Sequence, residues 1–343
     1  MSNQDMKTVA TPLEGIFIKR VYSDSVQTGD IRNDFQHDRD RILHSTAFRR
    51  LQYKTQVYMT HEGDLYRTRM THTLEVSQIA RGLAQYLEAD PDLTEAIALA
   101  HDIGHTPFGH AGEEKLGQLL KQYCIPFNHN IQSYRVLSEL EDRYIDFHGL
   151  NLTHAVYEGI LRHSTYLDKK EEIKSSITDD INHDVKDYWD TNQPGIEAQI
   201  VNMADVIAYA SHDIEDALAN GLIVWDDFKE RLIEKQVKFV YNLMANVEND
   251  VPESRSHKEW SSKIRPRILA RYLINTLMQR VARQAQDSIT KLPAKNGELH
   301  EQIRNLESEV VSLPQDFENQ VKILIEEVLF NDVYKEPRVM IMV

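Results

Sequence analysis

The chain contains a single cysteine among its 343 residues, Cys124. One cysteine excludes an intramolecular disulfide and a cysteine-rich metal site. The sequence also lacks an apolar run of about eighteen residues and a signal-peptide pattern, so we expect a cytoplasmic protein with no membrane partner. A repeat or a low-complexity tract is equally absent from the sequence.

Positive charge is scarce, because 39 lysines and arginines face 54 aspartates and glutamates, giving a net charge of −15. This balance argues against a protein whose main role is to coat nucleic acid, and no nucleic-acid partner is indicated. Residues 39–69 depart from the trend with a local basic cluster: Arg39, Arg41, Arg49, Arg50, Lys54, Arg67 and Arg69. A solvated basic face is the ordinary explanation of such a cluster, but its position just before His72 favours phosphate binding.

The periodicity of the apolar residues is almost entirely helical, which predicts an all-α fold with room for only a minor short β-hairpin near Phe17 or residues 57–58. Asp90 and Pro91 form an N-cap followed by a first-turn proline, and they open the helix that ends near Gly104. Further helical patterns cover residues 130–142, 152–163, 197–219, 226–247, 264–287 and 315–330. Residues 167–195 are polar and predict an exposed loop.

A histidine and an aspartate stand side by side at the end of an apolar, helix-forming run, at His101 and Asp102. An ionised carboxylate in such a place is unfavourable unless a cation or hydrogen-bond donors compensate it. His72 begins an amphipathic helical pattern, and Asp205 lies within a run that is apolar nearly all round. Each residue alone fits a hydrogen-bonded polar group of the core. The four together predict a site for one divalent ion, because two imidazoles and two carboxylates suit magnesium, manganese and other transition metals.

Further motifs surround these four residues: DRDRILHS at 38–45, HDIGHTPFGH at 101–110, FNHN at 127–130 and ADVIAYASHD at 204–213. With them the sequence resembles the HD-domain metallohydrolases, and among these the deoxynucleoside triphosphate triphosphohydrolases that include the bacterial dGTPases. The resemblance runs from about residue 30 to about residue 220 and continues weakly beyond. It implies a metal-dependent hydrolysis of dGTP or several dNTPs to deoxynucleoside and inorganic tripolyphosphate.

The resemblance also implies a catalytic group of His105, His110, Glu113 and His129. Glu113 follows His110 by three residues, so in a helix that begins nearby it can hydrogen-bond the His110 imidazole. A carboxylate in that position fixes the tautomer of a histidine and raises its basicity, as general acid-base catalysis requires. His105 and His129 would contact phosphate or protonate the leaving oxygen, and which does which stays open. For any one of these histidines alone, a solvated surface position is the alternative.

Substrate contacts follow from the same resemblance. Gln56 would bond the 3′-hydroxyl, and Val57 would crowd the 2′ position of the sugar. Tyr209 and Asp213 follow Asp205 by one and two helical turns, so one helix would present the metal ligand, a tyrosine beneath the deoxyribose and an acceptor for the 3′-hydroxyl. The expected electrostatic partners of the phosphates are Arg49, Lys54 and Arg69.

We expect three regions: an N-terminal arm at 1–30, an HD metallohydrolase core at 31–220, and a C-terminal helical region at 221–343 that looks shorter than is usual for the family. The last residues, 339–343, are apolar and need cover. Burial of these residues against a second subunit, together with the tendency of the family to form oligomers, predicts a homo-oligomer. An activating dNTP at a second site is a further expectation.

Two other classes of function stay open. Another HD phosphohydrolase, such as a 5′-nucleotidase or a phosphodiesterase acting on a signalling nucleotide, would share the metal ligands and release different products. A non-catalytic nucleotide sensor would keep a metal for stability alone. The sequence does not specify the base preference or the native metal.

Overall fold

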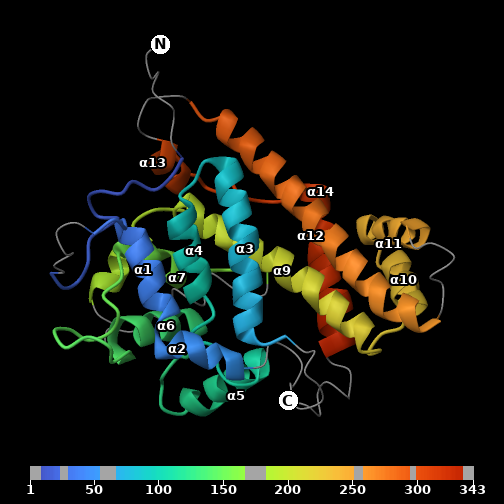
Figure 1. Cartoon of the computed structure of the whole chain (residues 1–343), viewed down its shortest axis with the longest axis horizontal. Helices are drawn as coiled ribbons and strands as arrows, with labels where there is room; N and C mark the ends of the chain where they lie inside the picture. The colour runs from blue at the N-terminus through green and yellow to red at the C-terminus, as the bar shows by residue number, and fades with distance from the viewer. Residues whose placement is uncertain are drawn as a thin grey trace.

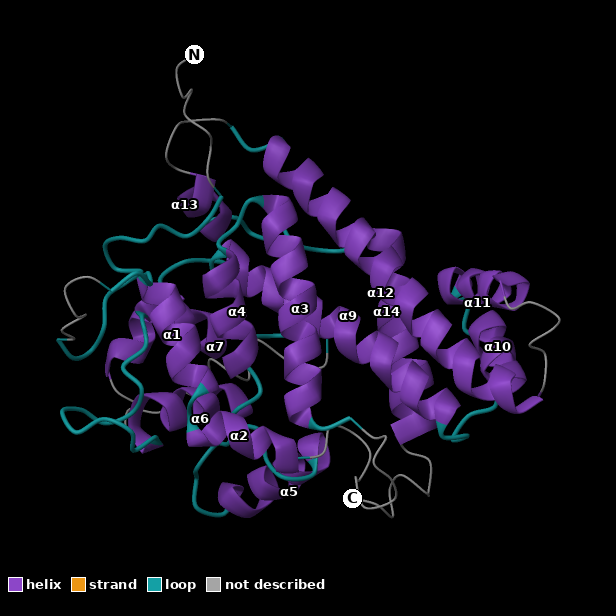
Figure 2. Ribbon diagram, in the orientation of Figure 1, coloured by secondary structure: helices purple, strands orange, loops and turns teal. Residues whose placement is uncertain are grey.

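The computed structural model describes residues 9–23, 30–54, 67–166, 183–250, 258–293 and 299–334. Throughout these ranges the chain forms helices and loops, and Figure 2 shows no strand in them, so the predicted all-α class is confirmed. Phe17 lies in a turn rather than in a strand, and residues 57–58 are outside the described ranges. None of the described helices combines the length and the apolar character needed to cross a membrane.

The helices occupy most of the described chain. Before residue 190 they are α1 (Asp34–Leu43), α2 (Thr46–Arg50), η1 (Leu51–Tyr53), α3 (Arg69–Leu87), α4 (Pro91–Ala100), α5 (Gly109–Lys121), α6 (His129–Arg135), η3 (Val136–Leu140), α7 (His154–Leu161) and η4 (His183–Trp189). After it they are α9 (Ile196–Ala219), α10 (Trp225–Glu234), α11 (Lys238–Asp250), α12 (Lys258–Thr290), α13 (Leu299–Arg304), α14 (Gln315–Ile323) and η6 (Leu324–Tyr334).

Local signals in the sequence set the ends of the helices that matter most. The Asp90 carboxylate accepts hydrogen bonds from the first backbone amides of α4, and Pro91 is its first residue, as predicted. Thr68 caps α3 through a reciprocal pair of hydrogen bonds with Thr71. The periodic stretch at 226–247 forms two helices rather than one, with Gln236 between them in the left-handed conformation (φ +61°) that is typical of a helix end.

Three helices form the centre of the molecule. α3, α4 and α9 pack on one another, and α9 is buried along nearly its whole length. In Figure 1, α3 stands in the middle and α12 runs diagonally across α9, on which it packs. The buried apolar residues form one cluster that extends from Val9 to Leu329, so the helices after residue 221 share their core with those before it. The three-region division itself stays a prediction.

A buried ionic group joins the C-terminal part of the chain to α7. The Arg304 guanidinium donates two hydrogen bonds of 2.7 Å to the Glu158 carboxylate, one to each oxygen. Arg162 donates to the same carboxylate at 3.2 Å. All three residues are buried, so this contact fixes α13 against the helix that leads to the candidate site.

Candidate metal centre

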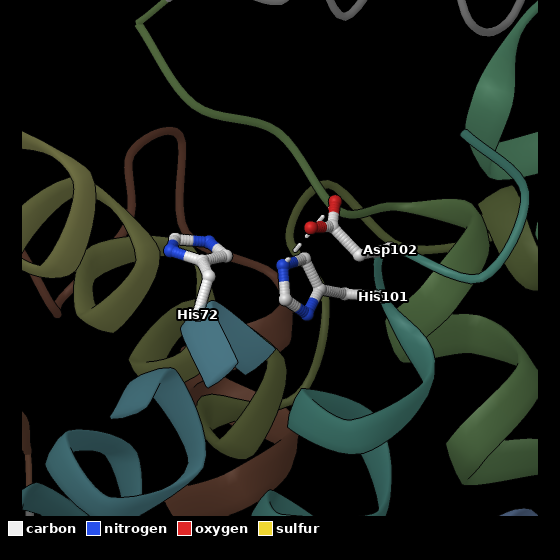
Figure 3. A group of neighbouring side chains, drawn as sticks. All are labelled: His72, His101 and Asp102. Atoms are coloured by element: carbon white, nitrogen blue, oxygen red, sulfur yellow. Dashed lines mark ion pairs between the residues drawn. The ribbon is translucent and has the colours of Figure 1, made fainter. Parts of the chain in front are cut away.

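The four predicted metal ligands come from three helices and meet in the interior. His72 lies in the first turn of α3, His101 and Asp102 follow the last residue of α4, and Asp205 lies in the middle of α9. All four are buried. Figure 3 shows the His72 and His101 rings turned toward one another, with the Asp102 carboxylate beside His101.

Imidazole nitrogens and carboxylate oxygens face each other across this centre. His72 Nε2 lies 2.9 Å from Asp205 Oδ1, and His101 Nε2 lies 3.5 Å from Asp102 Oδ1 and 3.9 Å from Asp205 Oδ1. His72, His101 and Asp102 can each offer one ligand atom within 4.8 Å of the others. The three helices therefore bring the four predicted ligands close to one another.

The protonation of His101 supports a cation at this centre. Its Nδ1 lies 2.7 Å from the carbonyl oxygen of Ala98, an acceptor, so Nδ1 carries the hydrogen. Its Nε2 must then present a lone pair toward the two carboxylates, and among the described residues this buried nitrogen has no hydrogen-bond partner. A lone pair that faces carboxylate oxygens is compensated by a metal ion, so the residues fit a divalent cation.

Arg69 holds one of the two carboxylates. Its Nη1 donates a 2.8 Å hydrogen bond to Asp102 Oδ2, which leaves Oδ1 on the side of the imidazoles. Burial alone would raise the pKa of Asp102, but the charge of Arg69 and the neighbouring imidazoles outweigh burial and hold the pKa well below its usual value. Burial likewise opposes ionisation of Asp205, but the contacts with the His163 and His72 imidazoles and the charge of His101 lower the pKa of Asp205. Both carboxylates are therefore ionised at neutral pH.

A second group of titratable side chains lies next to Asp102. His105 Nε2 is 3.1 Å from Asp102 Oδ1, and the His105 ring stacks on the His129 ring with centroids 3.9 Å apart. Both oxygens of Glu113 lie 3.1 Å from His129 Nδ1, and one also accepts a hydrogen bond from the His129 backbone amide at 3.0 Å. Burial and the charge of Arg69 lower the pKa of His105 well below its usual value, so His105 is neutral at pH 7.

Gly104 makes the juxtaposition of these two groups possible. It follows the His101–Asp102 pair, and its amide donates a 2.8 Å hydrogen bond to Ser133 Oγ on α6. A Cβ atom at this position would lie 2.2 Å from the carbonyl oxygen of His129 and from the amide nitrogen of Ser133. Only glycine allows the two backbones to approach so closely, and this approach sets His129 next to His105.

The predicted pairing of His110 with Glu113 involves a side chain outside the described residues, so it stays a prediction. α5 begins at Gly109, after Phe108 in a left-handed conformation, and the His110 side chain lies outside the described residues. Among the described side chains, Glu113 contacts His129, which belongs to a different helix, α6. The structure therefore adds a second histidine that Glu113 can orient, and the role of His110 stays a prediction.

The predicted substrate contacts are only partly near the centre. Lys54 Nζ donates to the carbonyl oxygens of Ile103 and His105 at 3.0 and 2.7 Å. Burial and the charge of Arg69 lower the pKa of Lys54 to about 8. Tyr209 and Asp213 are buried on α9, one and two turns after Asp205.

The other predicted substrate contacts are Arg49, Gln56 and Val57. Arg49 is exposed on α2. Gln56 and Val57 lie outside the described residues.

The basic cluster at residues 39–69 divides into several unrelated contacts. Arg67 forms ion pairs with Glu75, Glu215 and Asp216, and Arg39 pairs with Asp40 and Asp92. Arg41 donates to backbone carbonyls at residues 150 and 151. These three arginines form contacts within the protein that link segments of the chain. Within the cluster, Arg69 and Lys54 are the described side chains that contact residues of the metal centre or its neighbours.

Sequence reasoning missed one histidine. His163 Nε2 lies 3.3 Å from Asp205 Oδ2, and the His163 ring centroid is 5.0 Å from that of His101. Its signal was present in the sequence, because His163 ends a short apolar helical run at residues 155–161, much as His101 ends the run before it.

Comparison with known proteins identifies relatives. The HD domain family matches residues 69–210. A deoxyguanosinetriphosphate triphosphohydrolase-like protein of Rickettsia felis is 39% identical over 315 residues, which are 90% of this chain and 75% of the relative. Proteins of the same description from Ralstonia pickettii and Bordetella pertussis are 43% and 50% identical over 262 and 202 residues, which cover 76% and 58% of this chain. The match spans 59% of the Ralstonia protein and half of the Bordetella protein.

Proposed function

Because the chain belongs to the HD-domain family of deoxyguanosinetriphosphate triphosphohydrolase-like proteins, we propose that it hydrolyses deoxynucleoside triphosphates to deoxynucleoside and inorganic tripolyphosphate. The observation that carries this proposal is the buried centre of His72, His101, Asp102 and Asp205, in which the lone pair of His101 Nε2 faces two ionised carboxylates. We propose that these four residues hold magnesium, manganese or another transition metal ion.

A divalent cation bound there would polarise the α-phosphate and lower the pKa of a bound water. Glu113 fixes His129 by accepting the hydrogen on Nδ1, which leaves Nε2 as the basic atom that accepts or returns a proton. His105, neutral and stacked on His129, is a hydrogen-bond partner for phosphate oxygen at the same place. We propose that His110, on the first turn of α5, joins this acid-base group.

Arg69 and Lys54 supply fixed positive charge beside the reacting groups. Arg69 is oriented by Asp102, and Lys54 is held by two carbonyl oxygens of the segment that follows α4. Charge in a phosphoryl-transfer transition state is spread over the phosphate oxygens, so groups placed in advance in this way stabilise it. Arg49 would extend this positive charge outward along the triphosphate.

Selection of the sugar is proposed for Tyr209 and Asp213 on α9, together with Gln56 and Val57. Tyr209 would lie beneath the deoxyribose, and Asp213 would accept a hydrogen bond from its 3′-hydroxyl. A 2′-hydroxyl buried against Val57 without a partner costs about 1–3 kcal/mol, so we expect dGTP to be preferred to GTP by roughly 5- to 150-fold in kcat/KM. Comparable turnover of the two nucleotides would contradict this assignment.

Three further properties stay predictions. We expect a homo-oligomer, which sedimentation at micromolar concentration would detect, and an activating dNTP at a second site, which would appear as stimulation of one dNTP's hydrolysis by another. A cytoplasmic location belongs to the same proposal.

The test of the function is product analysis. The chain is incubated with each dNTP and Mg²⁺ or Mn²⁺, and the products are separated by anion exchange. Tripolyphosphate supports the proposal, whereas monophosphate or pyrophosphate would assign the chain to another class of HD phosphohydrolase. Asp102→Ala should lose bound metal and activity together, while Asp226→Ala, at an exposed position on α10, should keep both. Full metal content in Asp102→Ala, measured by elemental analysis, would contradict the proposed ligand set.

A further inference from the structure

His163 lies just beyond the end of α7 and is buried against α9. Among the described residues, its ring makes polar contacts with the side chains of Asn202 and Asp205 on α9. Nδ1 lies 2.9 Å from Asn202 Oδ1, and Nε2 lies 3.3 Å from Asp205 Oδ2. The His163 imidazole thus lies between the side-chain amide of Asn202 and the Oδ2 atom of Asp205. The other oxygen of Asp205, Oδ1, faces His72.

The hydrogen bonds around Asn202 determine where the proton of His163 resides. The backbone amide of Ser164 donates to Asn202 Oδ1 at 3.2 Å, so this atom is the oxygen of the amide and not its nitrogen. An oxygen accepts, and therefore His163 Nδ1 must be the donor of the 2.9 Å contact. In the neutral ring Nε2 then has a lone pair, and that lone pair is directed at another acceptor, Asp205 Oδ2.

A metal ion bound by both can reconcile two facing acceptors, and the spacing of the two atoms fits this arrangement. Two ligands that are each about 2.1 Å from one cation lie about 3.0 Å apart at a right angle and about 3.4 Å apart at the tetrahedral angle. The observed 3.3 Å between His163 Nε2 and Asp205 Oδ2 falls in this range.

The surroundings of His163 repeat those of His101. In His101, Nδ1 donates to the carbonyl oxygen of Ala98, and in His163, Nδ1 donates to Asn202 Oδ1. In both residues Nε2 is directed at the oxygens of buried carboxylates. His101, His163 and Asp205 can each offer a ligand atom within 4.8 Å of the others, and all three are buried.

We infer that His163 binds a divalent cation directly through Nε2, with Asp205 Oδ2 as its neighbour in the coordination shell. The inference rests on the metal centre proposed above and adds a third imidazole to it. A further nitrogen ligand favours manganese, iron, cobalt or zinc over magnesium, which prefers oxygen. The centre should therefore bind Mn²⁺ much more tightly than Mg²⁺, and His163 should account for much of that difference.

The direct test counts the imidazoles bound to the metal. The full chain, labelled with ¹⁵N-histidine, is loaded with Mn²⁺, and the coupled histidine nitrogens are counted by pulsed electron paramagnetic resonance. We expect three in the wild-type chain and two in His163→Ala. The count in the wild-type chain does not depend on whether any variant folds.

Binding affinities give the second readout. His163→Ala should weaken Mn²⁺ binding by at least about 10- to 100-fold and Mg²⁺ binding by much less. The matched control is His154→Ala, which removes a histidine at the other end of α7 whose ring packs against Tyr188, and it should change neither affinity.

Two outcomes would overturn the inference in different ways. Two coupled imidazoles in the wild-type chain, unchanged in His163→Ala, would leave the proposed centre in place and make His163 a hydrogen-bonded neighbour of Asp205. A wild-type chain that binds no Mn²⁺ would remove the proposed centre itself, and the inference with it.

Discussion

Replacing Glu113 by glutamine tests the acid-base group with little disturbance of the fold. In the structure this carboxylate contacts His129 Nδ1 through both oxygens and accepts the His129 backbone amide at 3.0 Å. A glutamine has the same size and keeps one carbonyl oxygen for the backbone amide. It loses the negative charge that stabilises the His129 imidazole when Nε2 accepts a proton.

The expected loss is therefore in turnover. A single acid-base contribution is typically 10²- to 10⁴-fold, so kcat of Glu113→Gln should fall by that factor, about 3–5 kcal/mol in the activation barrier. Because Glu113 is not among the ligands proposed for the metal, the affinity for Mn²⁺ should not change. The free energy of unfolding should change by less than about 1 kcal/mol, since the backbone hydrogen bond is retained.

The assay is tripolyphosphate release at saturating dNTP, with kcat and KM measured separately. Glu114→Gln is the control, because Glu114 is an exposed neighbour on α5 that contacts Gln118. The double variant Glu113→Gln with His129→Ala should be hardly slower than His129→Ala alone, since paired groups act as a unit. Turnover close to that of the wild-type chain in Glu113→Gln would refute the acid-base assignment.

Three further predictions follow from buried contacts. Gly104→Ala should lower the free energy of unfolding by about 1–3 kcal/mol, measured by urea denaturation, and should also lower kcat, because the new Cβ would lie 2.2 Å from a backbone oxygen of α6; wild-type values of both would show that α6 can move without consequence. Glu158→Gln should cost about 3–5 kcal/mol of stability, since it leaves the buried Arg304 guanidinium without its carboxylate; a loss under about 1 kcal/mol would contradict this. In the cation-free chain burial lowers the pKa of His72, but the hydrogen bond and charge of Asp205 outweigh burial and raise it above its ordinary value. Because only the neutral imidazole binds metal, Mn²⁺ affinity should be complete above that raised pKa and fall about tenfold per pH unit below it, and an affinity that is constant from roughly pH 5 to 9 would exclude this competition.

The clustering of His72, His101, Asp102 and Asp205 could be predicted from sequence because each is conspicuous in its own surroundings. Asp205 is an ionisable residue in an otherwise apolar helix, and His101 and Asp102 end an apolar run. Burial of such groups is unfavourable unless they are compensated, so local context alone indicates that they share a cation. The Asp90 N-cap and Pro91 predicted the start of α4 for the same reason, since capping depends on residues close in sequence.

Pairings between distant segments could not be predicted in this way. A carboxylate three residues from a histidine suggested the pair Glu113–His110, but no local pattern suggested the contact that Glu113 makes with His129 on another helix. The separate contacts of the basic residues at 39–69 could not be predicted for a related reason. Arg67, for example, neutralises carboxylates contributed by α3 and α9, and nothing near Arg67 in sequence identifies Glu215 or Asp216 as its partners.

The charges around the centre bear on the proposed function, because they predict that a cation should bind before a triphosphate does. Three carboxylates, Asp102, Asp205 and Glu113, face two fixed positive charges, Arg69 and Lys54, and the pKa of about 8 for Lys54 keeps it mostly protonated at neutral pH. Above the raised pKa of His72, where the imidazoles are neutral, this sum is one negative charge, which repels a polyanionic substrate. A divalent ion reverses the sum to one positive charge, in a buried place where charges interact strongly. An ion that compensates the two aspartates would thereby make the centre attractive to phosphate, so removal of the metal should abolish nucleotide binding as well as turnover.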